Sequence, residues 1–370
     1  MAEITIPREL LPVDGRFGCG PSKVRPEQVA ALAGIGAQLL GTSHRQAPIK
    51  NMVGRVRSGL SELFNLPDGY EVLLGNGGST AFWDAAAFSL IEKQSQNMVC
   101  GEFGGKFASA AKTPWLTAPD VINAPAGSRA DAVAKAGIDT YAWAHNETST
   151  GVMSPVTRVN GDAGALTVVD ATSAAGGIKI DAAETDIYYF APQKNFASDG
   201  GLWLAMMSPA AIERVERIHA SDRYIPEFLS VKTALDNSRL NQTLNTPAIA
   251  TLYLLNDQIK WINQNGGLKW ADARTKQSSK LLYDWAEKTS VASTYVSNPD
   301  HRSQVVVTID FEAGIDATEI TKTLRANGVV DVEPYRKLGR NQIRVATFVS
   351  TDPSDVAALI NCLDFVLERI

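Results

Sequence analysis

Cysteine and histidine are scarce in this 370-residue sequence, which contains three of the former and four of the latter. Cys19, Cys100 and Cys362 are odd in number and widely separated, so they indicate neither a disulfide framework nor a redox pair. No two histidines lie at ligand spacing, and we therefore expect no catalytic metal site. Separate thiols of this kind are typical of a reducing compartment.

A long apolar run is also missing. No segment approaches the roughly 20 apolar residues needed to cross a bilayer, and residues 1–8 lack the basic region and apolar run of a signal peptide. The formal net charge is -5, which gives no electrostatic reason to expect a nucleic acid or an anionic membrane as partner. We therefore expect a cytoplasmic protein, whose substrate can still be a small anion bound at a locally cationic site.

What the sequence does contain is a pattern of short apolar segments. Apolar residues make up 45% of the chain and charged residues 20%, as in ordinary globular proteins. Residues 49–64 follow the 3.6-residue period of a helix, and 81–91 reads as a buried helix. Unbroken apolar runs bounded by Gly, Pro, Asp or Asn occur at 70–74, 98–100, 140–144, 166–169, 187–191 and 202–206. Strands buried on both faces have this pattern, so we predict an α/β fold with a mostly parallel sheet covered by helices.

The pattern changes after about residue 260. The sequence predicts a helix over 269–288, a strand over 303–311, a helix over 317–326, strands over 329–332 and 343–348, and a terminal helix with Ser354 as its N-cap. Because the chain exceeds what one hydrophobic core usually serves, we expect two domains. The boundaries we predict are 16–260 for a large domain and 261–370, with 1–15, for a small C-terminal α+β domain.

The segment 186–201 carries Lys194 from a predicted strand into a turn, and two glycines then lead into the next strand. Burying a lysine as a cation is costly, so we expect the pKa of Lys194 to be lowered. A lysine of this kind can form a Schiff base with an aldehyde cofactor. Taken alone, a lysine whose ammonium simply reaches solvent is the more frequent case.

Asp170 ends the apolar run that begins at residue 166. A carboxylate in this position can keep the pyridine nitrogen of pyridoxal phosphate protonated, which makes the ring an electron sink. An aspartate that only caps the following turn would give the same pattern.

Asn76-Gly77-Gly78-Ser79-Thr80 separates a predicted strand from a predicted helix. Glycines let the backbone approach a ligand closely, and the free N–H groups of a helix N-terminus bind phosphate. The segment matches neither a Walker sequence nor the dinucleotide pattern, and an ordinary structural turn explains it equally well. However, the glycine turn, Asp170 and Lys194 all follow predicted strands, and ligands of open α/β sheets bind beyond the carboxyl ends of strands. Their joint occurrence favours convergence on one ligand.

Over nearly its whole length the chain resembles the phosphoserine aminotransferase family, a branch of the class V, fold-type I enzymes that use pyridoxal phosphate. The motifs that carry the resemblance are Phe17-Gly-Cys-Gly-Pro21, Thr42-Ser-His-Arg45, His145-Asn-Glu-Thr148-Ser-Thr-Gly151, Val169-Asp170-Ala-Thr-Ser173, Ala191-Pro-Gln-Lys194-Asn195, Asn245-Thr246-Pro247 and the segment from Pro334 through Tyr335 and Arg336 to Arg344.

The resemblance implies that Lys194 forms the Schiff base and that Asp170 pairs with the pyridinium nitrogen. The other cofactor contacts that it implies are Gly78, Ser79 and Gln193 around the phosphate, Thr148 near the ring hydroxyl, Phe103 stacked on the ring, and Asn245 and Thr246 reaching the phosphate from the second subunit of a homodimer. For the substrate it implies Arg344 as a bidentate fork for the α-carboxylate, and His44, Arg45 and Arg336 for a phosphate.

The implied reaction transfers the amino group of glutamate to 3-phosphohydroxypyruvate, giving O-phosphoserine and 2-oxoglutarate in L-serine biosynthesis. Such a reaction predicts ping-pong kinetics. Two alternatives remain open: a class V aminotransferase acting on alanine, serine or glyoxylate, which would not need the cationic phosphate pocket, and a protein that binds pyridoxal phosphate without catalysis.

Overall fold

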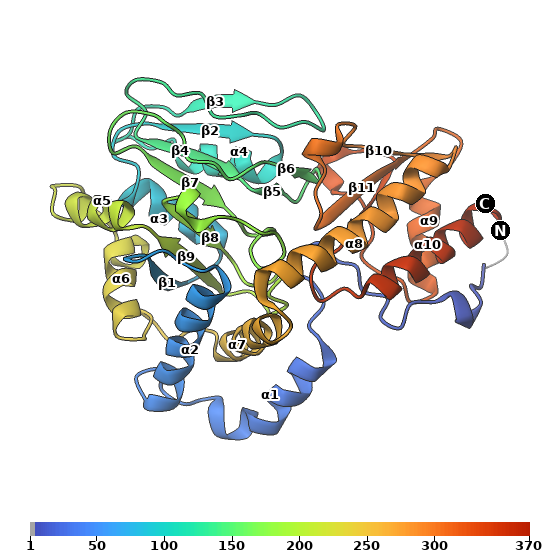
Figure 1. Cartoon of the computed structure of the whole chain (residues 1–370), viewed down its shortest axis with the longest axis horizontal. Helices are drawn as coiled ribbons and strands as arrows, with labels where there is room; N and C mark the ends of the chain where they lie inside the picture. The colour runs from blue at the N-terminus through green and yellow to red at the C-terminus, as the bar shows by residue number, and fades with distance from the viewer. Residues whose placement is uncertain (1–3) are drawn as a thin grey trace.

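A seven-stranded sheet forms the centre of the larger part of the molecule in a computed structural model that describes residues 4–370 (Figure 1). Its strand order is β1-β9-β8-β7-β4-β2-β3. The strands are β1 (Glu71–Asn76), β2 (Ser95–Val99), β3 (Asp120–Asn123), β4 (Thr140–Ala144), β7 (Leu166–Asp170), β8 (Ile187–Phe190) and β9 (Leu202–Met207). Strand β9 is antiparallel to both of its neighbours, whereas the pairs from β8 to β3 are all parallel. The predicted α/β fold with a mostly parallel sheet is therefore confirmed.

Side chains along the central strands point alternately to the two faces of this sheet, and both faces are buried under helices. Tyr188 and Phe190 of β8 belong to a core shared with α2 (Ala47–Leu63) and α7 (Ile249–Gln264), and α1 (Pro26–Leu39) packs against α7. Ile187 and Tyr189 belong to the core on the other face, which is shared with α3 (Ser79–Ser89), α4 (Glu102–Ala110), α5 (Pro209–His219) and α6 (Val231–Arg239). A sheet enclosed in this way has no polar face, which explains why its strands are unbroken apolar runs in the sequence.

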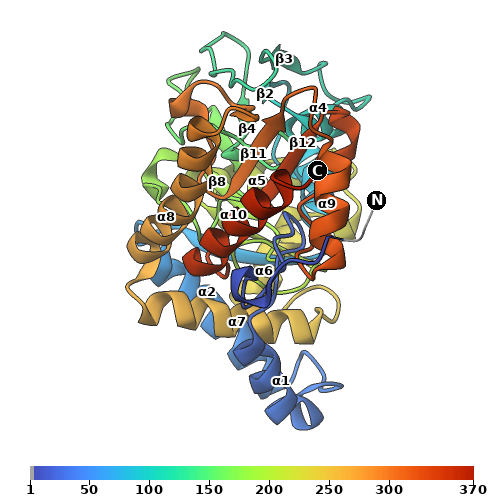
Figure 2. The same ribbon diagram turned by 90° about the vertical axis from the view of Figure 1, so that its right-hand side faces the viewer.

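A second, antiparallel sheet consists of β10 (Ala292–Thr294), β11 (Val306–Phe311) and β12 (Gln342–Ala346). Three helices pack with it, α8 (Gly267–Lys288), α9 (Ala317–Ala326) and α10 (Pro353–Leu367), and in Figure 2 they lie in front of its strands. Helix α8 contributes Leu268 and Ala271 to the first core and Leu282 and Trp285 to this one. Short elements complete the fold: β5 (Asn146–Glu147), β6 (Val152–Met153), and the 3-10 turns η1 (Arg8–Leu10), η2 (Ala182–Glu184), η3 (Glu227–Leu229), η4 (Pro299–His301) and η5 (Arg336–Leu338).

Two sequence predictions in the C-terminal part are wrong. The run 329–332 forms no strand, only an isolated bridge between Arg16 and Val330, because Asp331 has a φ of 66° and interrupts the extended backbone. The N-cap of α10 is Asp352 rather than Ser354. The carboxylate of Asp352 accepts bonds from the backbone N–H and the hydroxyl of Ser354, at 2.9 and 2.7 Å, which places Ser354 inside the first turn.

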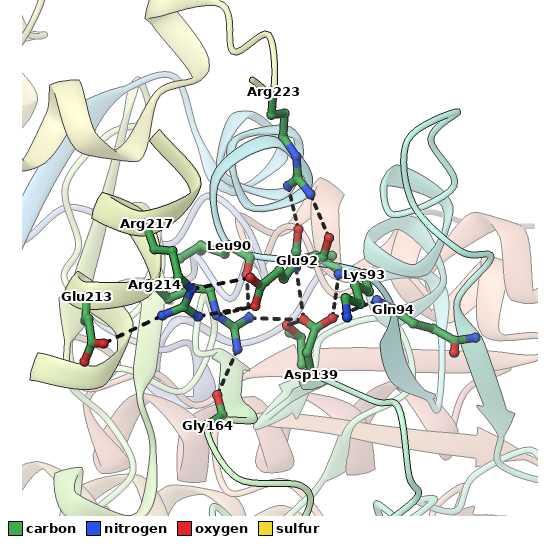
Figure 3. A network of polar contacts seen from close by, with 12 residues as sticks. Leu90, Glu92, Lys93, Gln94, Asp139, Gly164, Glu213, Arg214, Arg217 and Arg223 are labelled. Carbon is green, nitrogen blue, oxygen red and sulfur yellow. Dashed lines mark hydrogen bonds and ion pairs between the residues drawn. The ribbon is translucent and has the colours of Figure 1, made fainter. Parts of the chain in front are cut away.

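Asp139, immediately before β4, anchors the end of the sheet at which the parallel strands begin (Figure 3). Its carboxylate accepts hydrogen bonds from the backbone N–H groups of residues 92–94, at 3.0, 2.6 and 2.8 Å, and so fixes the loop before β2. Arg214 of α5, which is almost fully buried, donates to the same carboxylate at 3.1 Å. A helix and two strands are thus joined through one carboxylate.

Among the described residues 4–370, none of the helices combines the length and the hydrophobicity that a membrane span requires.

Candidate active site

A cavity of about 450 Å³ opens at the edge where the parallel strands end. The cavity is lined by the turn after β1 (Gly78, Ser79), the start of α4 (Phe103), the turn after β5 (Thr148), the end of β7 (Asp170) and the loop after β8 (Gln193, Lys194). The glycine turn, Asp170 and Lys194 therefore converge on one cavity, as their positions after predicted strands indicated. The geometry follows from the parallel sheet, since the carboxyl ends of its strands meet at one edge.

Lys194 is buried at the bottom of this cavity, with a relative exposure of 7%. Its Nζ donates to the carbonyl oxygen of Cys19 at 2.5 Å and to the hydroxyl of Thr148 at 3.5 Å. Burial lowers the pKa of Lys194 to about 8, as predicted from the sequence. The segment that carries Cys19 passes so close to the lysine that a Cβ on Gly20 would lie 2.5 Å from Nζ. Near neutral pH, more of this amine is therefore neutral than for an ordinary lysine, and a neutral amine can attack an aldehyde.

Asp170 lies at the end of β7 with both carboxylate oxygens bonded. Oδ1 accepts from the backbone N–H of Thr172 at 2.9 Å, and Oδ2 accepts from Trp83 Nε1 and the Tyr189 hydroxyl at 3.2 Å each. Burial raises the pKa of Asp170, and these hydrogen bonds act in the opposite direction. A carboxylate with these donors can pair with a cation inside the cavity.

The glycine turn between β1 and α3 forms an open cradle. Gly77 has a φ of 102°, which disfavours any residue with a side chain there. A Cβ on Gly78, the N-cap of α3, would meet no atom within 4 Å. Ser79 follows, and its hydroxyl bonds to that of Thr172 at 2.6 Å. The exposed N–H groups at the start of α3 can therefore bind a phosphate without obstruction.

Glu147 fixes the start of α4 by hydrogen bonds to its backbone. It is fully buried, and its Oε2 accepts from the backbone N–H groups of Phe103 and Gly104 at 3.0 Å each. Its Oε1 accepts from the N–H and the hydroxyl of Ser149, at 3.1 and 2.6 Å. Burial raises the pKa of Glu147, against the effect of these bonds. This contact fixes Phe103, whose ring centroid lies 5.9 Å from Lys194 Nζ.

Arg344 of β12 approaches the cavity from the second sheet. Its Nη1 donates to the carbonyl oxygen of Thr148 at 3.0 Å, and its guanidinium lies 5.3 Å from the centroid of the Tyr335 ring. Its Nε is buried and has no hydrogen-bond partner within residues 4–370. A donor in this state is expected where a ligand supplies the acceptor.

Six predicted site residues do not line this cavity in the single chain: Arg344, which only approaches it, and five residues that lie further away. His44 and Thr246 contact each other, with Nδ1 and Oγ1 3.0 Å apart, and Arg45 donates to Gln242. Asn245 is exposed and lies beside Asn76, whose Nδ2 bonds to the Asn245 and Thr246 carbonyls at 3.4 and 3.1 Å. Arg336 is exposed on η5. Within residues 4–370 no hydrogen bond or ion pair joins Arg336 to the His44 and Arg45 pair.

Sequence reasoning missed four groups of the site: Trp83, Tyr189, Glu147 and the Cys19 carbonyl. A signal was available for two of them. Trp83 lies in the predicted helix 81–91, three residues after the glycine turn 76–80, and so close to the predicted phosphate site. Glu147 stands inside the motif from His145 to Gly151. Tyr189 and the Cys19 carbonyl depend on contacts between distant segments, for which the sequence offers no local pattern.

Pyridoxal phosphate, the cofactor that the sequence motifs imply, fits the residues present. The cavity offers a buried amine with a lowered pKa for the aldehyde, an aspartate for the ring nitrogen and a free helix N-terminus for the phosphate. The side-chain oxygens of Asn146 and Gln193, two residues that line the cavity, are buried and lack partners within residues 4–370. Both remain free to bond to a ligand.

Comparison with known proteins agrees with this geometry. The aminotransferase class-V family model matches residues 126–332. A protein of Mycolicibacterium vanbaalenii is 61% identical over 372 residues, covering 100% of both chains. The phosphoserine aminotransferase of Nocardioides sp. is 59% identical over 370 residues, covering 99% of both. The crystal structure of a phosphoserine aminotransferase from Cytophaga hutchinsonii has a TM-score of 0.86 at 24% identity, and the match covers 97% of this chain and 100% of that one. The chain therefore belongs to the phosphoserine aminotransferase family of the class V aminotransferases, which are pyridoxal-phosphate-dependent transaminases.

Proposed function

We propose that this enzyme transfers the amino group of glutamate to 3-phosphohydroxypyruvate, giving O-phosphoserine and 2-oxoglutarate. The observation that carries the proposal is the buried Lys194, with its lowered pKa, in one cavity with Asp170 and the free N-terminus of α3. The high identity with a relative named phosphoserine aminotransferase supports the choice of substrate.

Pyridoxal phosphate, when bound, delocalises the charge that develops at the substrate Cα. The residues of the chain do the rest. Lys194 Nζ would take the proton from the substrate Cα and later release it, and a group with a pKa of about 8 can both accept and donate a proton near neutral pH. Asp170 would pair with the ring nitrogen, and Arg344 would hold the α-carboxylate with its free Nε.

The remaining cofactor contacts in the proposal come from the same cavity. Gly78 and Ser79 bind the cofactor phosphate with the start of α3, and Gln193 lies beside them. Thr148, whose hydroxyl lies 3.5 Å from Lys194 Nζ, would bond to the ring hydroxyl. Phe103, whose backbone N–H bonds to Glu147, would stack on the ring.

A homodimer completes the site in this proposal. Lys194 is the one cationic side chain among the described residues that line the cavity, so a phosphate-bearing substrate needs further cations from elsewhere. His44 and Thr246 are joined by a hydrogen bond and would therefore enter a neighbouring cavity together. We propose that a second copy contributes Asn245 and Thr246 to the cofactor phosphate, and that His44, Arg45 and Arg336 bind the substrate phosphate.

We also propose the domain boundaries 16–260 and 261–370, with 1–15. The second core supports them, because it gathers Ile6 with residues from α8 to α10. A cytoplasmic location is proposed as well, and the three free thiols at Cys19, Cys100 and Cys362 are in keeping with it.

The test is an absorbance titration of the cofactor-loaded enzyme with O-phosphoserine, and separately with serine and alanine. We expect O-phosphoserine to remove the yellow band of the lysine-bound cofactor at far lower concentration than the other two. Equal conversion by alanine or serine would favour a class V aminotransferase for small unphosphorylated substrates. Absence of the band would refute the cofactor assignment. Replacing Arg45 by glutamine should weaken O-phosphoserine specifically, since it removes a cation without touching Lys194.

A further inference from the structure

The side chains behind Asp170 form a small closed network. Trp83 Nε1 and the Tyr189 hydroxyl both donate to Asp170 Oδ2, at 3.2 Å, and Trp83 Nε1 also donates to the Tyr189 oxygen at 2.9 Å. Tyr189 is fully buried, and Trp83 is 4% exposed. Neither residue carries a charge at neutral pH, and the reaction itself gives neither a role.

Both residues are held firmly by their surroundings. The Tyr189 ring stacks on Phe82 with the centroids 4.1 Å apart, and Phe107 meets it edge-on at 6.1 Å. Strand pairing sets Tyr189 directly beside Asp170, its register partner across β7 and β8. A side chain in such packing keeps one rotamer, so its hydroxyl stays directed at the carboxylate.

Trp83 links this network to the phosphate cradle. It lies on α3 four residues after Ser79, which is one turn of helix on the same face. Both residues line the cavity. One rigid helix therefore presents the N–H groups for a phosphate at its start and, about 6 Å along its axis, the indole that holds Asp170.

We propose that Trp83 and Tyr189 are positioning residues, which keep the Asp170 carboxylate ionised and oriented toward the ring nitrogen of the cofactor. The proposal rests on the role proposed for Asp170. An ionised carboxylate in an apolar setting is stable only when donors surround it. Thr172 donates a hydrogen bond to one carboxylate oxygen, and Trp83 and Tyr189 donate to the other.

Other titratable groups also act on Asp170 and must be considered in a pH experiment. Lys194 can carry a positive charge, and Glu147 can carry a negative one. The phenols of Tyr188 and Tyr189 are the others, and burial raises the pKa of both well above the usual value, so they stay neutral. Substitutions at Trp83 or Tyr189 change none of these charges at neutral pH. A shift in pH dependence therefore reports on the donors themselves.

Tyr188 offers a matched control. It adjoins Tyr189 in β8, is equally buried and also has a bonded hydroxyl, but its partner is His145 Nδ1 at 3.0 Å in the core on the other face. Replacing Tyr188 by phenylalanine removes the same atom from the same strand without touching Asp170. Any general effect of losing a buried hydroxyl in β8 appears in this variant too.

The experiment measures the affinity of cofactor-free enzyme for pyridoxal phosphate as a function of pH, in wild type, Tyr189→Phe, Trp83→Phe and Tyr188→Phe. Loss of a donor raises the pKa of Asp170, so the pH below which affinity is lost should move upward in the first two variants. Their affinity at neutral pH should fall roughly tenfold, as for one hydrogen bond to a charged group. Tyr188→Phe should match wild type in both respects.

Other outcomes overturn the proposal. If Tyr189→Phe and Trp83→Phe keep the wild-type midpoint and affinity, or if Tyr188→Phe changes as much as they do, the two residues have a structural role only. Trp83→Phe provides the same test should Tyr189→Phe fail to fold. If the wild-type chain does not bind pyridoxal phosphate, the proposed function falls and this proposal falls with it. A wild type that binds beside unchanged variants refutes this proposal alone.

Discussion

Replacing Arg344 by lysine should weaken substrate binding without unfolding the chain. The guanidinium donates to the Thr148 carbonyl at 3.0 Å, and its buried Nε has no partner within residues 4–370. A carboxylate that meets this Nε gains a fork-like, charge-assisted contact. Lysine keeps the positive charge but carries it as a single point, so it cannot bind the Thr148 carbonyl and both oxygens of a carboxylate in the same geometry.

The size of the effect follows from the bonds lost. One hydrogen bond to a charged group contributes about 1.5–3 kcal/mol, which corresponds to a loss of about 10- to 150-fold in kcat/KM. Because the α-carboxylate is common to all of the proposed amino-acid substrates, the loss should be similar for glutamate and for O-phosphoserine. The thermal midpoint of unfolding should change little, since the charge is retained and β12 keeps its backbone pairing with β11.

The assay is steady-state kcat/KM for both amino acids, with Arg340→Lys as the matched control. Arg340 lies in the segment that leads into β12, is exposed and pairs with Asp310, so its replacement should leave kcat/KM unchanged. A loss of less than about threefold in Arg344→Lys, or an equal loss in both variants, would refute the assignment of Arg344 to the carboxylate.

Three further predictions concern the lysine and the far end of the sheet. Lys194→Ala should abolish turnover while circular dichroism shows an intact fold, and substantial remaining activity would refute the mechanism. Because the pKa of Lys194 is lowered to about 8 by burial, the rate at which cofactor-free enzyme captures pyridoxal phosphate should rise with pH below that value and level off above it. A rate that stays flat across this range in stopped-flow absorbance would contradict the shift. Asp139→Asn should lower the free energy of unfolding by about 2–4 kcal/mol, because an amide cannot accept from all the N–H groups of residues 92–94 and leaves some unpaired. Urea unfolding would show this against Asp222→Asn at an exposed position, and kcat should stay normal in both because Asp139 lies away from the cavity.

The sequence predicted the parts of the site that depend on local order along the chain. Asp170 and Lys194 each follow a buried strand, and the sheet brings the ends of parallel strands together whatever the details of packing. Neither residue is diagnostic alone, since capping aspartates and strand-end lysines are common. Only their order along the chain, with the glycine turn, made one ligand the better explanation.

Features that depend on conformation or on distant contacts were not predictable in this way. The apolar run 329–332 resembles a strand, but the positive φ of Asp331 is not visible in a pattern of apolar residues. The bond from Tyr189 to Asp170 depends on the register between β7 and β8. The group of His44, Asn245 and Thr246 lies outside the cavity of its own chain, so its proposed role depends on a second copy.

Burial drives the two ionisable groups at the centre of the cavity toward their neutral forms. It lowers the pKa of Lys194 to about 8 and raises the pKa of Asp170. For the lysine this shift serves the chemistry, because only the neutral amine attacks an aldehyde or takes a proton from carbon. For the aspartate the same shift opposes its proposed role, because a neutral acid cannot pair with a pyridinium.

The hydrogen bonds around the two groups differ accordingly. Asp170 receives donors from Thr172, Trp83 and Tyr189, all of which favour the ionised form. Lys194 contacts only a carbonyl and a hydroxyl, and within residues 4–370 no carboxylate forms an ion pair with it. The surrounding hydrogen bonds therefore favour the ionised form of Asp170 and do less to favour the ionised form of Lys194. The donors behind Asp170 therefore matter to the proposed chemistry together with the carboxylate, because the burial that lowers the pKa of the lysine also raises the pKa of the aspartate.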